Sequence, residues 1–199
     1  MEVSVLLALD IGFRNMGWLV FNPFTDTVVD FGCIQTEKLS GKRSIRLRVS
    51  EDDFYRCQRT AMGLCAIISE HRVTGIVAEI PTGGARGARP NRTMGLATGL
   101  LAGLCEAVSI PTETYSPMEI KKAATGQRNA SKEAVIEAMT KRFPAIASFD
   151  RPALMEHIAD AAAVIIAAQD GILYRTVKRS MGEQARRKQF KGLYPSKEE

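Results

Sequence analysis

Short apolar runs alternate along this chain with longer stretches whose apolar residues recur at helical spacing. Residues 3–9 are almost wholly apolar and end at Asp10, which predicts a buried strand. Two further strands are expected at 16–21 and 27–35, separated by an Asn-Pro turn at 22–23. Because the connections between these three strands are too short for crossovers, the strands cannot all be parallel.

The rest of the chain alternates between expected helices and single strands. Apolar runs predict strands at 75–80 and 111–115, and polar composition predicts exposed loops at 38–53 and 82–93. Capping residues and apolar spacing predict helices over 54–70 and 94–108, from Ser116 to Gly126, from Ser131 to Pro144, and from Pro152 to Gly171. This order fits an α/β fold in which a mixed five-stranded sheet carries helices on both faces.

Length and composition favour one globular domain over residues 1–172 and a basic tail over 173–199. The 4 cysteines show no metal-binding spacing, which indicates reduced thiols and a cytoplasmic location. Neither a signal peptide nor a membrane span is expected. Asp10 interrupts the first apolar run, and Glu156, His157 and Asp160 interrupt the longest one.

Acidic residues close or interrupt three of the apolar segments. Asp10 and Glu79 end two expected strands, and Asp160 lies in an alanine-rich helix three residues after His157. A buried carboxylate is costly unless it is paired, and carboxylate oxygens are the ligands that Mg2+ prefers. The pattern predicts a shared divalent-metal site, with Glu156 as a substitute or outer ligand. Plainer roles stay open: Asp10 as a turn cap, Glu79 as a satisfied buried acid and His157 as a structural residue.

Positive charge is concentrated in two segments. The formal net charge of +5 favours a polyanionic partner. The first segment follows Glu79, and its Arg86, Arg89 and Arg92 are expected to contact DNA. The second is the tail, for which a solvated, partly disordered chain is the alternative. Its expected DNA contacts are the basic residues Arg186, Arg187 and Lys188 and the stacking rings of Tyr174, Phe190 and Tyr194.

Several motifs, in their order and spacing, resemble the RuvC family of Holliday-junction resolvases within the RNase H-like superfamily. The segment LALDIGFRNMGW resembles the family's first strand, whose catalytic aspartate falls at Asp10, and IVAEIP resembles the strand whose catalytic glutamate falls at Glu79. MGLATGLLAGL is similar to the family's small-residue helix, and TGQRNASKEAV to the segment that follows it. In HIADAAAVIIAA, His157 and Asp160 take the family's last two site positions.

This resemblance implies an RNase H-like fold and a homodimeric endonuclease that cuts four-way DNA junctions. It implies that Asp10, Glu79 and Asp160 bind Mg2+, for which Mn2+ can substitute, at two ions per site. His157 would be a fourth ligand or would activate the attacking water. Lys132 would contact the DNA near the scissile phosphate, or it is only a solvated lysine at a helix start. The helix at 94–108 would form part of the dimer surface, although packing within the monomer explains its small residues equally well.

The chain departs from the family directly after Glu79. Bacterial members usually carry a stacking phenylalanine there, whereas this chain reads Ile80-Pro81-Thr82, which favours a reader of shape and phosphate like divergent bacteriophage members. Three other functions stay open. An ATP-dependent kinase would use Asp10, Gly12 and Gly17, although the chain is short for its two lobes. The others are an RNase H-type or flap nuclease and a non-catalytic module that binds branched DNA.

Overall fold

A single five-stranded sheet forms the centre of the molecule, with the strand order β3-β2-β1-β4-β5. The computed structural model describes residues 4–39, 48–81 and 87–193, with side chains described as far as Glu183. The strands are β1 (Val5–Asp10), β2 (Asn15–Asn22), β3 (Thr27–Gln35), β4 (Val73–Glu79) and β5 (Thr112–Tyr115). β1, β2 and β3 form an antiparallel meander, whereas β4 pairs in parallel with both β1 and β5. The expected mixed sheet is confirmed.

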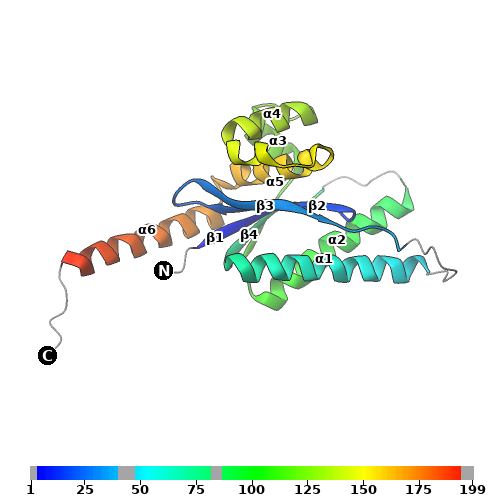
Figure 1. Cartoon of the computed structure of the whole chain (residues 1–199), viewed down its shortest axis with the longest axis horizontal. Helices are drawn as coiled ribbons and strands as arrows, with labels where there is room; N and C mark the ends of the chain where they lie inside the picture. Colours follow the sequence, from blue (N-terminus) through cyan, green and yellow to red (C-terminus); the bar gives the residue numbers. More distant parts are fainter. Residues whose placement is uncertain (1–3, 40–47, 82–86, 194–199) are drawn as a thin grey trace.

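Helices cover both faces of this sheet. The helices are α1 (Val49–His71), α2 (Ala88–Val108), α3 (Pro117–Thr125), α4 (Lys132–Arg142), α5 (Met155–Ala168) and α6 (Ile172–Leu193). Two short 3-10 turns, Pro144–Ser148 and Pro152–Leu154, connect α4 to α5. Figure 1 shows α3, α4 and α5 on one face and α1 and α2 on the other, with α6 running away from the sheet. Among the described residues, no helix combines the length and hydrophobicity needed to span a bilayer.

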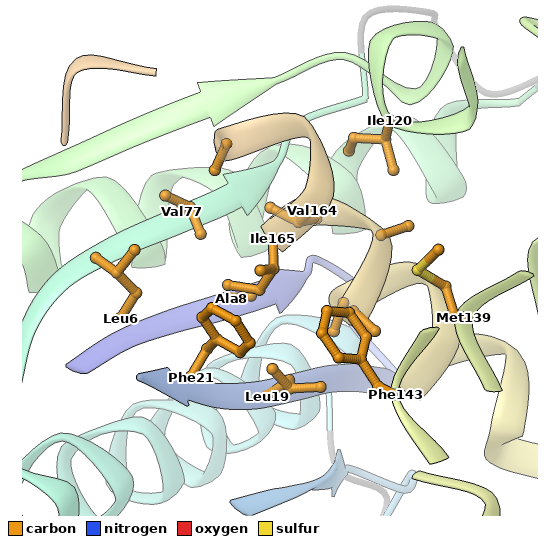
Figure 2. Packing of buried hydrophobic residues seen from close by; sticks show 14 of the residues in the cluster. Leu6, Ala8, Leu19, Phe21, Val77, Ile120, Met139, Phe143, Val164 and Ile165 are labelled. Atoms are coloured by element: carbon orange, nitrogen blue, oxygen red, sulfur yellow. The ribbon is translucent and has the colours of Figure 1, made fainter. Parts of the chain in front are cut away.

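The two faces of β1 supply two separate hydrophobic cores. Leu6 and Ala8 point toward α5, whereas Leu7 and Leu9 point toward α1 and α2, and all four are fully buried. Figure 2 shows the α5 side, where strand residues such as Phe21 pack under the helix. Because successive strand residues face opposite sides, an uninterrupted apolar run is the pattern required of a strand covered on both faces.

The helix predicted at 54–70 begins earlier, at Val49, so the expected loop at 38–53 is partly wrong. Its start is stabilised by Arg48, whose backbone N–H donates to the Glu51 carboxylate at 2.8 Å in a capping box. The first turns bury Asp52 and Asp53, which the sequence pattern had placed on an exposed surface. The remainder of that loop, 40–47, lies outside the described residues.

The loop expected at 82–93 is shorter than predicted, because α2 begins at Ala88 and not at residue 94. Arg89 and Arg92 therefore lie on the first turns of a helix. Both are held there by the buried carboxylate of Asp53, at 2.8 Å and 3.3 Å respectively. An ion pair between distant segments is not visible in local composition, and it explains the error. Residues 82–86 lie outside the described part of the chain.

The segment expected to be a tail begins as a packed helix. Tyr174, Val177 and Met181 of α6 are buried in the core on the α5 side, and the Tyr174 ring stacks on Phe21 with centroids 6.3 Å apart. The expectation that Tyr174 stacks on nucleic-acid bases is therefore wrong, because its ring is already enclosed by protein. The side chains of Phe190 and Tyr194 lie outside the described residues.

Candidate active site

Two strand ends and one helix bring the acidic residues together. β1 and β4 are parallel neighbours, and their last residues, Asp10 and Glu79, are direct partners in the register. The helix α5 packs across β1, β2 and β4 on one face of the sheet. It places His157 and Asp160 beside the strand ends, where the Nδ1 atom of His157 lies 2.8 Å from the Oδ2 atom of Asp10.

A glycine permits this close approach of helix and strand. Gly17 on β2 is the register partner of Asp10. A Cβ atom at this position would lie 2.0 Å from the carbonyl oxygen of His157, a distance that no real Cβ contact shows. A side chain at position 17 would therefore push α5 off the sheet and move His157 away from Asp10.

The charges at this site are crowded. Burial, together with the nearby Asp10 and Asp160 carboxylates, raises the pKa of Glu79 from 4.5 to about 8. Burial and the Asp10 carboxylate likewise raise the pKa of Asp160 from 3.8 to about 7. The Lys121 side chain acts in the opposite direction on both groups. Buried carboxylates whose pKa values are raised by neighbouring carboxylates form a site where a cation is favoured.

Two lysines approach the carboxylates from α3 and α4. Lys132, the first residue of α4, donates to the Oε2 atom of Glu156 at 2.6 Å, and this hydrogen bond raises the pKa of Lys132. Asp160 and Asp10 also act on that pKa, so Lys132 lies at the edge of the acidic cluster. Lys121 of α3 is half-buried and acts on Glu79 and Asp160. The sequence offered no motif that would have identified Lys121.

His157 is held from its other side by a chain of hydrogen bonds. Arg151 donates to the Oε1 atom of Gln35 at 3.0 Å, and the Gln35 amide donates to the Oδ1 atom of Asn15 at 3.2 Å. The Asn15 amide nitrogen then lies 3.2 Å from the Nε2 atom of His157. Because arginine can only donate, Arg151 fixes the Gln35 amide with its oxygen toward Arg151, and Gln35 then fixes the Asn15 amide with its nitrogen toward His157. The Nε2 atom of His157 therefore accepts, and the proton of the neutral ring is assigned to Nδ1, facing Asp10.

This arrangement has opposing effects on the protonation of His157. The hydrogen bond to Asp10 raises the pKa of the imidazole above its ordinary value. Burial opposes that shift. The amide donor at Nε2 acts in the same direction as burial, because a protonated Nε2 would face a second donor. His157 is thereby positioned to hold the Asp10 carboxylate in one orientation.

The donor set suits a hard cation such as Mg2+, since three of its members are carboxylates. Among the residues that the structure describes, no three acidic, histidine or cysteine side chains are gathered closely enough to hold an ion as they stand. Asp10 is instead hydrogen-bonded to His157. The fit of a metal therefore rests on the chemistry of the donors and on the raised pKa values of Glu79 and Asp160.

The other residues expected at the site have different surroundings. Arg89 and Arg92 pair with Asp53, which restrains their guanidinium groups although both side chains stay partly exposed. Arg86 lies outside the described residues, as do the side chains of Arg186, Arg187 and Lys188. The sequence did not identify Asn15, Gln35, Lys121 and Arg151 as site residues, because no motif links them.

The two glycines of the kinase-like motif have local steric roles. A Cβ atom at Gly12 would lie 1.9 Å from the carbonyl oxygen of Asn15, and one at Gly17 would meet α5. Both glycines are therefore explained by the β1–β2 turn and by helix packing, without a bound nucleotide. A motif of Asp10, Gly12 and Gly17 thus carries no argument for a kinase.

A mixed sheet of this order, with helices on both faces, is the RNase H-like fold. Its first and fourth strands end in carboxylates, and the helix that crosses them carries a third. The family model described as crossover junction endodeoxyribonuclease RuvC matches residues 6–168. The chain belongs to this RuvC family.

Individual relatives agree with this assignment. The chain is 27% identical over 133 residues to the crossover junction endodeoxyribonuclease RuvC of Salinibacter ruber, covering 66% of this chain and 68% of the relative. It is 32% identical over 100 residues to that of Porphyromonas gingivalis, covering 50% of this chain and 52% of the relative.

Solved structures share the fold. The T. thermophilus RuvC in complex with a Holliday junction substrate superposes with a TM-score of 0.64 at 20% identity, covering 82% of this chain and 92% of that one. The yeast mitochondrial Holliday junction resolvase Ydc2 gives a TM-score of 0.54 at 13% identity, covering 92% of this chain and 86% of that one.

Proposed function

We propose that this chain is a metal-dependent, structure-selective endonuclease that resolves four-way and related branched DNA junctions in recombination and repair. The observation that carries the proposal is the meeting of Asp10, Glu79 and Asp160 at one edge of the sheet, in a member of the RuvC family. The crowding of their charges supports a divalent cation as the missing positive partner.

Asp10, Glu79 and Asp160 would hold Mg2+, or Mn2+ in its place, at two ions per site, with His157 as a fourth ligand or as the group that assists the attacking water. When bound, such ions activate water for in-line attack on a phosphodiester and stabilise the leaving oxygen. In the arrangement seen here, His157 orients the Asp10 carboxylate through Nδ1. Lys121 and Lys132, which lie close enough to the acidic cluster to act on its charges, would bind non-bridging phosphate oxygens.

The cleavage test uses a labelled mobile four-way junction with and without Mg2+, beside linear duplex, flap and RNA–DNA hybrid. Wild-type protein should make paired, symmetric nicks in the junction only with metal. Asp10→Asn and Asp160→Asn should retain junction binding but lose more than about 100-fold in rate, beyond the 10- to 100-fold typical of residues outside the ligand shell. Asp170→Asn, an exposed carboxylate just beyond α5, is the charge-matched control and should cut normally.

Each of the other outcomes would change the proposed function in a different way. Near wild-type cutting by Asp10→Asn would refute the metal-site assignment. Preferential cutting of the hybrid or of the flap would replace the junction by the RNase H-type or flap substrate. Tight junction binding without cleavage of any substrate would make the chain a non-catalytic DNA-binding module.

Homodimerisation through α2 is part of the same proposal. Ala97, Leu101 and Cys105 are the buried face of this helix. Its opposite face carries Gly95, Gly99 and Gly103 at intervals of four, and a Cβ atom added at any of them would meet nothing within 4 Å. Each exposed glycine inside a helix lowers stability by about 0.5–1 kcal/mol relative to alanine. A partner helix packed closely against Gly95, Gly99 and Gly103 would explain why glycines occupy these positions.

The dimer test compares Gly99→Leu with Ala123→Leu, an exposed site on α3 across the sheet. Sedimentation velocity over a range of concentrations should show a dimer for wild type and for the α3 variant, and a shift to monomer for Gly99→Leu. A monomeric wild type, or a Gly99→Leu protein that still dimerises like the control, would remove α2 from the interface.

A further inference from the structure

A pocket of about 450 Å³ is lined by three cationic side chains. Arg14 comes from the β1–β2 turn, Lys38 from the segment after β3, and Arg56 from α1. Thr36 and Glu37 complete the described lining, so one carboxylate faces three positive groups. None of these residues stood out in the sequence, because they come from three segments far apart in the chain.

Arg56 forms a fixed floor for this pocket. Its residue is only 6% exposed, and its guanidinium group lies over the Phe13 ring, 4.3 Å from the centroid. The Nε atom donates to the Thr36 hydroxyl at 3.1 Å, and Nη2 donates to the backbone carbonyls of Phe13 and Thr36, each at 3.3 Å. These contacts leave little freedom to the side chain, so its position is set before any ligand arrives.

Among the described residues, none forms a salt bridge with Arg56, although the Glu37 carboxylate lines the same pocket. All of its acceptors among these residues are neutral oxygens. Asp53, one turn away on α1, is committed to Arg89 and Arg92, and Asp52 accepts from the Leu39 backbone at 2.9 Å. A buried cation without a salt-bridge partner is costly, which favours an anionic ligand in this pocket.

Arg14 connects the pocket to the active site. It also lines a second hollow together with Asn15, Gln35 and Arg151, the residues whose hydrogen bonds reach His157. A strand of DNA leaving the active site over the β1–β2 turn would therefore meet Arg14 first and the Arg56 pocket next. Backbone phosphates are the anions that such a strand presents.

We propose that Arg14, Lys38 and Arg56 form a subsite for a backbone phosphate of the DNA substrate, outside the scissile phosphate. The proposal rests on the proposed nuclease function. Arg56 supplies a preset donor at the pocket floor, and the exposed Arg14 and Lys38 close over the phosphate from the rim. The subsite fixes the course of the strand and carries no base specificity, because phosphate contacts position the protein without reading sequence.

The test measures junction binding by fluorescence anisotropy at several KCl concentrations in EDTA. The rim variant Arg14→Gln/Lys38→Gln should bind more weakly, and the slope of log K against log salt should fall by about 0.9 for each phosphate that the protein no longer neutralises. The control Arg72→Asn/Lys141→Gln removes the same charge from exposed sites away from the pocket, and asparagine tolerates the left-handed backbone at position 72. The control slope should match wild type.

A second arm replaces single junction phosphates by neutral methylphosphonates. Wild-type protein should lose affinity at a small set of phosphates, and the rim variant should become insensitive at one or two of them while keeping its response at the others. Additive losses at every phosphate, or a rim variant that binds like the control, would overturn the subsite. Arg56→Gln adds a third measurement. If it melts like wild type, it should lose the same phosphate response.

The outcomes separate the subsite from the nuclease function. If wild type binds and cuts junctions but the rim variant behaves like the control, only the subsite is refuted, and Arg56 is then a structural link between α1 and the β1–β2 turn. If wild type binds no junction at all, both proposals are refuted. A response to phosphate neutralisation that disappears only in the rim variant supports the subsite.

Discussion

At the scale of single residues, His157 lies between two groups that favour different protonation states of its ring. Asp10 at Nδ1 favours the protonated form, and the Asn15 amide at Nε2 favours the neutral one. Arg151 and Gln35 set the direction of that amide from a distance. The protonation state of a residue at the centre of the site is thus decided partly by side chains that touch no acidic residue there.

Replacing Asn15 by alanine should therefore raise the pKa of His157, because the opposing donor is removed. The chain has 2 histidines, so side-chain 15N NMR needs to assign only His157 and His71, and His71 serves as the internal reference. In wild type the Nδ1 atom should carry the proton of the neutral ring. An unchanged pKa and tautomer in Asn15→Ala would show that the hydrogen-bond chain does not act on His157.

Glu79 makes the stability of the metal-free protein depend on pH. Its pKa is 4.5 when unperturbed and about 8 in the fold, so the folded state binds its proton more tightly than the unfolded state. Its contribution to stability is therefore fully present below pH 4.5 and is lost as the pH rises through 8. Asp160 adds a loss of the same sign between its values of 3.8 and about 7.

Thermal melting in EDTA should show the midpoint falling across this pH window. The fall should be smaller in Glu79→Gln, whereas Glu183→Gln, at an exposed carboxylate on α6, should follow wild type. Added Mg2+ should stabilise wild type more at pH 8 than at pH 5.5, because bound metal replaces protons on the carboxylates. A Glu79→Gln profile as steep as that of wild type would contradict the assignment.

At the scale of elements, the site depends on how closely α5 lies on the sheet. The helix is rich in alanine and is buried along most of its length, so its backbone approaches β1 and β2 closely. Gly17 is the point of closest approach, against the carbonyl oxygen of His157. The distance between helix and strand is therefore set by the absence of a side chain at one position of β2.

Gly17→Ala should destabilise the fold by about 1–3 kcal/mol, as overpacking of a core does, and should weaken the contact between His157 and Asp10. Chemical denaturation measures the first effect, and the NMR pKa of His157, which should fall toward its ordinary value, measures the second. Gly182→Ala on α6 is the matched control, because its new Cβ would meet only Phe24 at 3.9 Å. If Gly17→Ala has the same free energy of unfolding as wild type, then α5 can move away from β2 without a loss of stability.

At the scale of the whole molecule, α6 belongs to the core in its first half and projects away in its second half (Figure 1). The carboxylate of Glu113 on β5 accepts from the Ile172 and Leu173 backbone N–H groups at 3.3 Å each, which fixes the start of the helix. The part of α6 that packs in the core therefore extends as far as Met181, and the proposed DNA-binding tail would begin after it and not at residue 173.

Removing residues 184–199 should leave the melting temperature near that of wild type, while junction affinity and its salt dependence both fall, because the removed segment carries Arg186, Arg187 and Lys188. Removing 175–199 should also unfold part of the core, because Val177 and Met181 are removed with it. A full-length variant with glutamine at the three basic positions distinguishes the effect of lost charge from the effect of a shorter chain. Binding that is unchanged in all of these variants would make the basic segment a bystander.

Features that depend on local pattern could be predicted from the sequence. The continuous apolar run before Asp10 and the short connections after it were sufficient for a mixed sheet with helices on both faces. The carboxylates at strand ends and the spacing of His157 and Asp160 were sufficient to locate the acidic site, because parallel strands end at a common edge and residues three apart share a helix face.

Contacts between segments distant in sequence could be found only in the folded structure. The ion pairs of Asp53 with Arg89 and Arg92 join the first turns of α1 and α2, both of which begin before their predicted starts. The burial of Tyr174 moved the beginning of the tail. The Arg56 pocket likewise joins three segments. Composition cannot identify such partners, because a side chain's neighbours are set by the packing of whole elements and not by the residues beside it in the chain.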